Sequence, residues 1–95
     1  MTDGELLKLT KQDLQKMDSR SDDYLMTLVS AAKIKIAEEG VQLDLQNVNH
    51  CLLVSQYAAY LFRKRAAPET DMPRFVRYGL NNLLLAQKGG GGRDV

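Results

Sequence analysis

The segment from residue 47 to residue 65 constrains the fold most, because its apolar side chains leave almost no polar face. On a helical wheel they surround the axis: Leu52, Leu53, Val54, Tyr57, Leu61 and Phe62. A helix that is apolar all round is buried by other elements. The run CLLVSQYAAYLF contains Ser55 and Gln56 and is too short to span a bilayer. We therefore expect a central core helix that begins near Asn47 or Asn49 and ends near Arg65.

The segment before it carries the signals of a complete helix. Ser21 suits an N-cap, and Asp22 and Asp23 then fall in the first turn, where the helix dipole favours negative charge. Gly40 suits the position just after the helix end. Apolar residues recur along one stripe: Leu25, Leu28, Val29, Ala32 and Ile36. Ile34 lies on the opposite side, where it could pack inside the domain or contact another chain.

A short first helix is predicted from Thr10, which suits an N-cap and has Asp13 in the following turn. It would end near Met17 and bury Leu14 and Met17. Residues 40–47 are expected to form a loop.

The last helix is predicted to begin at Pro73, after a linker over residues 66–72, and to run to about Lys88. One stripe of this helix is polar: Arg74, Arg77, Asn81 and Lys88. Another face holds Phe75, Gly79, Asn82 and Ala86. Glycine costs about 1 kcal/mol relative to alanine inside a helix, so we expect Gly79 to permit a close approach.

These segments together predict an all-α fold. Residues 1–88 should form one domain, a small bundle of about four helices around the long central helix. Residues 89–95 begin with four glycines, which offer no side chains to pack, so they predict an extended and flexible C-terminal tail.

Charge is divided unevenly along the chain. Residues 1–47 hold nine acidic and six basic side chains, a net −3, whereas residues 48–95 hold three acidic and seven basic ones, a net +4. Such a division is consistent with copies that attract each other head to tail. It is also consistent with an ordinary solvated surface.

No catalytic constellation is evident, and we expect neither an enzyme nor a cofactor or metal. His50 is the only histidine, and it is expected to be a capping or surface residue. Cys51 is the only cysteine, which excludes a disulfide within the chain and favours a reducing compartment. Adjacent helical residues point about 100° apart, so these two do not form a Cys–His pair. An enzyme built on His50 is the weakest of three options. The N-terminal sequence lacks the features of a signal peptide, and no membrane association is expected.

A small helical DNA-binding module is an alternative function. Its phosphate contacts would come from the basic stripe of Arg63, Arg65, Arg74 and Arg77. Aromatic residues are not interleaved with these arginines, and no helix-turn-helix spacing is apparent. Pairing of the arginines with carboxylates of the same or a neighbouring chain is the interpretation that we prefer.

Three blocks of the sequence resemble a known family. They are SRSDDYLMTLVSAAKIKIAEEGV, CLLVSQYAAYLFRKRA and MPRFVRYGLNNLLLAQK. Over about residues 5–88 the chain is similar to the small head–tail connector (adaptor) proteins of long-tailed bacteriophages. The third block is the most specific, and the glycine tail has no counterpart in the resemblance.

The resemblance implies a structural role without an active site. Such proteins form a ring, expected to be twelve-fold, beneath the portal protein at the special vertex of the capsid. The ring extends the DNA channel without sequence recognition and supports the next neck protein, of the stopper or tail-completion type. The implied location is the head–tail junction of the virion, with assembly in the host cytoplasm.

A ring requires two different patches that meet on neighbouring copies. The acidic start of the second helix and the basic residues of the third and fourth helices are the candidates: Asp22, Asp23, Arg63, Arg65, Arg74, Arg77, Asn81 and Asn82. The tail is the candidate for docking to the portal: Gly89, Gly90, Gly91, Gly92, Arg93, Asp94 and Val95.

Overall fold

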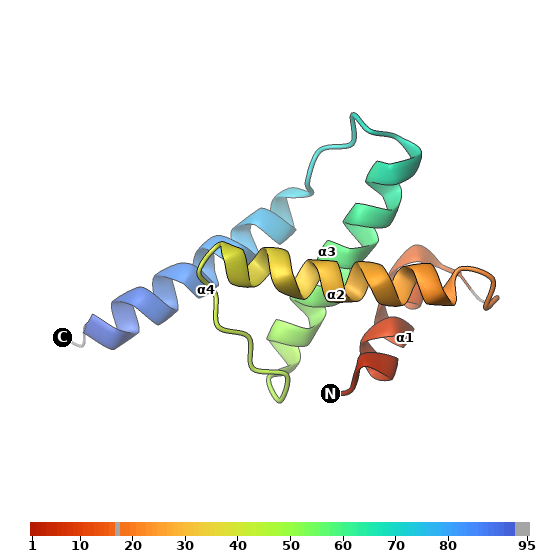
Figure 1. The fold of residues 1–95 in the computed structure, drawn as a ribbon. Coiled ribbons are helices and arrows are strands. Elements are labelled where there is room, and N and C mark those ends of the chain that lie inside the picture. The colour runs from red at the N-terminus through yellow and green to blue at the C-terminus, as the bar shows by residue number, and fades with distance from the viewer. Residues whose placement is uncertain (17, 93–95) are drawn as a thin grey trace.

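The computed structural model describes residues 1–16 and 18–92 and confirms the all-α class (Figure 1). The chain forms four helices: α1 (Asp3–Leu14), α2 (Asp22–Glu38), α3 (Val48–Ala66) and α4 (Arg74–Gly92). The described part of the chain contains no strand. None of its helices is both long enough and apolar enough to cross a membrane.

Helix α3 is the central element, as its sequence predicts. Asn47 caps it by accepting hydrogen bonds from the backbone N–H groups of Asn49 and His50. The helix packs against each of the other three, and Leu53, Val54 and Tyr57 lie in the core. The apolar surface is not buried all round, however. Leu61 and Phe62 are half-buried, and Leu52 is exposed.

Helix α2 agrees closely with the prediction. The core face consists of Leu25, Val29, Ala32 and Ile36, with Leu28 partly buried beside them. Ser21 occupies the N-cap position, although its side chain makes no capping hydrogen bond. Gly40 follows the helix end with a φ of 106°, a conformation that favours glycine.

The start of α1 corrects the sequence-based prediction. Thr2, and not Thr10, is the N-cap, and it forms a capping box with Glu5. Thr10 lies inside the helix, fully buried, where its hydroxyl donates to the carbonyl of Leu6 at 2.9 Å. Leu14 is the last helical residue and is only half-buried. The expected burial of Met17 lies outside the described residues.

The loop over residues 40–47 is tied to α3 by two adjacent residues. The backbone N–H of Asp44 donates to Nδ1 of His50 at 2.9 Å. The thiol of Cys51 donates to the carbonyl of Leu45 at 3.3 Å. His50 is therefore buried, in contrast to the capping or surface position that we expected, because the loop folds over it.

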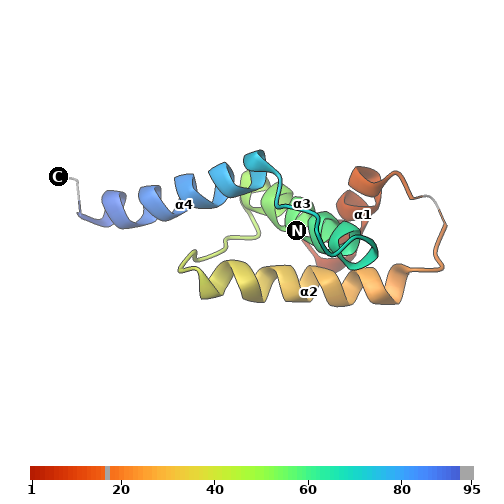
Figure 2. The ribbon, with the colours of Figure 1, turned by 90° about the horizontal axis from the view of Figure 1, so that it is seen from above.

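Helix α4 leaves the body as an arm. It packs chiefly along α3 and extends beyond the other helices in both views (Figures 1 and 2). Val76 and Leu80 are its fully buried anchors. Gly79 does permit a close approach, since a Cβ there would lie 3.2 Å from Cδ1 of Leu53. Two hydrogen bonds of 2.9 Å join the Gln87 side-chain amide to the backbone of Gln42 in the loop.

The end of α4 differs from the expected tail. The helix continues past Lys88 to Gly92, so Gly89, Gly90, Gly91 and Gly92 belong to it. Glycine costs about 1 kcal/mol relative to alanine inside a helix, so the four glycines weaken this last turn. The remaining residues of the predicted tail, Arg93, Asp94 and Val95, lie outside the described residues.

Candidate assembly surface

Two of the predicted interface residues form ion pairs with α1. Asp22 at the start of α2 forms an ion pair with Lys11 of α1, with 2.9 Å between the carboxylate oxygen and Nζ. Arg63 of α3 lies 3.5 Å from the carboxylate of Asp13 and donates to its backbone carbonyl at 3.0 Å. Both pairs join α1 to a neighbouring helix of the same chain.

Arg77 forms an ion pair that joins the arm to α2. Its guanidinium makes two hydrogen bonds to Glu39, at 2.8 and 3.3 Å, and so joins α4 to the end of α2. The hydrogen bonds to Glu39 raise the pKa of Arg77 above its ordinary value. The sequence suggested a partner in the same or a neighbouring chain. The structure places the partner in the same chain, 38 residues away.

Arg65 belongs to an aromatic cluster at the end of α3. Its guanidinium lies 4.7 Å from the ring centre of Tyr24, and that ring lies 6.1 Å from the ring of Phe62. Lys16 lies 5.2 Å from the other ring, that of Phe62. Stacking of cations on aromatic faces stabilises this corner of the body.

The other predicted interface residues remain at the surface: Asp23, Arg74, Asn81 and Asn82 are all exposed. Within residues 1–16 and 18–92, the side chains of these four make no ion pair or hydrogen bond. Asp23 lies on the side of α2 opposite its core face, whereas Asn82 borders the hollow between α3 and α4. Of the predicted interface residues, these four therefore remain available for contact with another molecule.

The arm exposes more apolar surface than the sequence suggested. Phe75 is 56% exposed, Tyr78 59% and Leu85 69%. They lie near the exposed arginine and asparagines of the arm on the side turned away from α3. Exposed apolar surface marks contact sites on soluble proteins when it forms a contiguous patch. Sequence reasoning missed Tyr78 and Leu85 because it could not tell which side of the helix the body covers.

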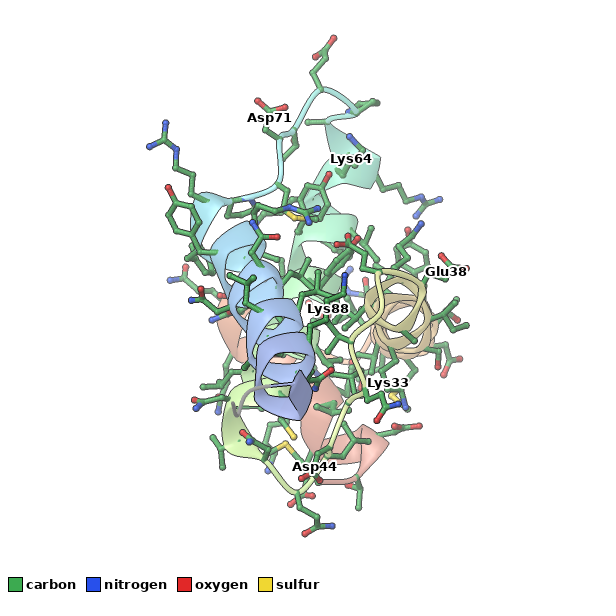
Figure 3. All side chains as sticks on the ribbon, turned by 90° about the vertical axis from the view of Figure 1, so that its left-hand side faces the viewer. Lys33, Glu38, Asp44, Lys64, Asp71 and Lys88 are labelled. Carbon is green, nitrogen blue, oxygen red and sulfur yellow. The ribbon has the colours of Figure 1, made fainter. Side chains whose placement is uncertain are left out.

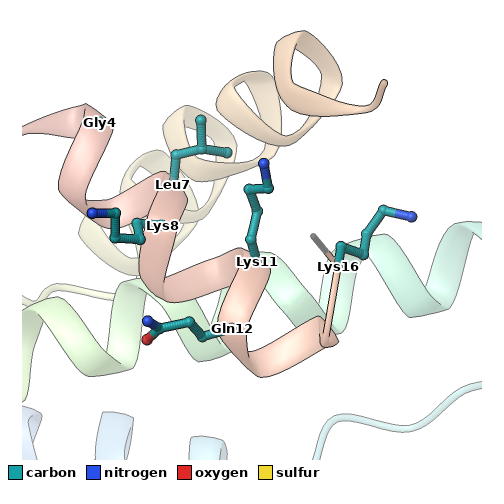
Figure 4. A pocket seen from close by; sticks show the side chains of 6 residues that line it. All are labelled: Gly4, Leu7, Lys8, Lys11, Gln12 and Lys16. Atoms are coloured by element: carbon teal, nitrogen blue, oxygen red, sulfur yellow. The ribbon is translucent and has the colours of Figure 1, made fainter. Parts of the chain in front are cut away.

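Two surface hollows accompany these features. The larger, of about 440 Å³, runs along α1 and is lined by Gly4, Leu7, Lys8, Lys11, Gln12 and Lys16 (Figure 4). Lys11 and Lys16 already bind Asp22 and the ring of Phe62. The other, of about 340 Å³, lies between α3 and α4 beside Leu52, Gly79 and Asn82. Neither hollow gathers a nucleophile with a base.

No group of three His, Cys, Asp or Glu side chains in the described part of the chain could hold a metal ion. His50 and Cys51 both make structural hydrogen bonds to the loop. Comparison with protein-family models, with curated proteins and with solved structures finds no match to this chain.

Proposed function

We propose that this chain is a structural protein of the head–tail junction of a long-tailed bacteriophage. Its copies form a ring that joins the portal protein to the next neck component and extends the DNA channel. The observation that carries the proposal is the α4 arm, on which Phe75, Tyr78 and Leu85 are exposed. The resemblance of residues 5–88 to connector proteins supports the same role.

The distribution of charge supports contact between unlike surfaces. The segment over residues 72–92 contains three basic and no acidic residues, whereas residues 1–71 contain eleven acidic and nine basic ones. A basic arm attracts the more acidic body of another copy more strongly than it attracts a second arm. Contacts between two different patches generate rings when the rotation closes and filaments when it does not.

The alternative of a DNA-binding module meets a structural obstacle. Arg63 and Arg77 already bind carboxylates of the same chain, and Arg65 lies over Tyr24. Only Arg74 of the proposed basic stripe is without such a partner within the described residues. Contact with DNA in the proposed ring would be electrostatic and independent of sequence.

The mass of the assembled particle tests the proposal. We expect light scattering and native mass spectrometry to show a closed ring for the purified protein, or for the protein mixed with the portal of the same virus. Twelve copies is the number that the resemblance implies. A monomer under both conditions would contradict the proposal. Salt-dependent binding of that monomer to duplex DNA would favour the alternative function instead.

The tail is proposed to contact the portal. Deletion of residues 89–95 removes the last helical turn and the three residues beyond it. We expect the shortened protein to keep its helical circular dichroism spectrum and to bind the portal more weakly than the full chain. Equal binding would show that the tail takes no part in docking.

A further inference from the structure

One side of α2 is wholly exposed and bears a regular pattern. Five residues form this α2 outer stripe, at spacings of four, three, four and four: Asp23, Thr27, Ser30, Ile34 and Glu38. The stripe lies opposite the core face that contains Val29 and Ile36. The side chains in the middle of the stripe are small, apart from Ile34, which is 59% exposed. The residues at its two ends are acidic. Small side chains let another helix approach closely.

Helix α4 carries a stripe of almost the same spacing and of opposite charge. Five exposed residues form this arm stripe: Arg74, Tyr78, Asn81, Leu85 and Lys88. Its middle contains the two most exposed apolar side chains of the arm, and its two ends are basic. Lys88 lies at the border of the stripe, where it lines a third surface hollow, of about 450 Å³, together with Gly40, Gln42 and His50.

The two stripes match in length. At a rise of about 1.5 Å per residue, Arg74 and Lys88 are separated by about 21 Å along their helix, and Asp23 and Glu38 by about 22 Å. Both pairs of opposite charges can therefore form together when the helices lie side by side. In the parallel register Leu85 meets Ile34, and in the antiparallel register Tyr78 meets it. Each register covers the exposed apolar groups of both stripes.

The two stripes of one copy cannot satisfy each other. Glu38 points to the side of α2 that faces away from α4, whereas Lys88 lies on the side of α4 nearer to α2 (Figure 3). Arg77 and Glu39 hold the inner sides of the same two helices together. The acidic stripe therefore faces solvent, and a basic stripe can reach it only from another molecule.

We propose that the arm stripe of one copy docks on the α2 outer stripe of the next. The occupant of the acidic stripe is thus a second copy of this chain, and the contact joins two unlike surfaces. This inference rests on the proposed assembly function and specifies the junction between neighbours. Two ion pairs enclose an apolar centre at each junction, and the junction repeats around the ring.

Charge reversal tests the junction. An arm-reversed variant carries Arg74→Glu with Lys88→Glu, and a stripe-reversed variant carries Asp23→Lys with Glu38→Lys. Each variant alone places like charges at both ends of every junction. We expect either one to raise the concentration needed for half-assembly at least tenfold, which corresponds to about 1.4 kcal/mol. All four positions are exposed, so the circular dichroism spectrum should stay helical.

Mixing the two variants gives the sharpest outcome. An equimolar mixture can alternate around the ring, so that each reversed arm meets a reversed stripe and each native arm meets a native stripe. We expect the mixture to assemble as the native protein does, and native mass spectrometry to find the two variants in equal numbers. High salt should weaken the native assembly and the mixed one alike.

The matched control is Lys8→Glu with Lys35→Glu, which reverses two exposed charges outside both stripes. It should leave assembly unchanged. If the native protein forms a ring and the single-sided variants assemble equally well, or the mixture fails to recover, the proposed junction is wrong while the assembly function stands. If the native protein never forms an oligomer, alone or with the portal, both proposals are wrong.

Discussion

The anchoring of α4 can be measured with two leucines of the same helix. Leu80 is fully buried against α3, and Leu85 is 69% exposed. Truncation of a buried leucine to alanine costs about 2–5 kcal/mol. We expect Leu80→Ala to fall in the lower half of that range, about 2–3 kcal/mol, because α4 packs chiefly on one helix and the site can partly collapse. Leu85→Ala should cost less than about 0.5 kcal/mol.

Chemical denaturation and hydrogen exchange together test this expectation. A domain of this size has a total stability of about 5–14 kcal/mol, so a loss of 2–3 kcal/mol is readily measured. Exchange should show where the loss falls. Amides of α4 from residue 76 to residue 88 should exchange faster in Leu80→Ala, while the core amides of α2 change less. Equal losses for Leu80→Ala and Leu85→Ala would refute the described packing of the arm.

Three further predictions follow from local contacts. Gly79→Leu should destabilise the protein by about 1–3 kcal/mol in denaturant melts, because the added side chain meets Leu53; an unchanged midpoint would mean that the approach is not close. Arg77→Met should cost about 1 kcal/mol or less and speed exchange in α4, since the ion pair is partly exposed; slower exchange would contradict its bracing role. The pKa of Glu5 is lowered because its carboxylate accepts a hydrogen bond from the backbone N–H of Thr2. The capping box therefore stabilises the fold fully above the ordinary pKa of 4.5. This stabilisation is lost as pH falls through the lowered pKa. Between about pH 6 and about pH 3 the melting temperature should therefore fall further for the native protein than for Glu5→Gln, and equal slopes would exclude this contribution.

The elements with clear terminal signals could be predicted from the sequence. Helix α3 begins after Asn47, whose side chain accepts two backbone N–H groups, and α2 ends before Gly40, whose positive φ favours glycine. Ser21 occupies the N-cap position of α2 without a capping hydrogen bond. The start of α1 was wrong because two threonines offered an N-cap. Thr2 has a glutamate three residues later, which is the stronger signal, and Thr10 proved to be a buried residue with its hydroxyl bonded to Leu6.

The candidate surface could be predicted only in part. The sequence identified the outward residues Asp23, Arg74 and Asn81, since helical spacing fixes which residues share a side. It could not assign the partner of Arg77, because Glu39 approaches only after the loop turns the chain back. The complementary stripes require both helices to be in place, since exposure depends on which side the core covers.

The link between Gln87 and the loop has a geometric consequence for the proposed ring. The loop is fixed to α3 through His50, and Gln42 in turn fixes the arm through both polar groups of one amide. The angle of the arm relative to the body is thereby set by the loop. In a closed ring that angle determines the rotation from one copy to the next, about 30° for twelve copies and about 28° for thirteen. The two hydrogen bonds between Gln87 and Gln42 would thus help to determine the number of copies in the ring.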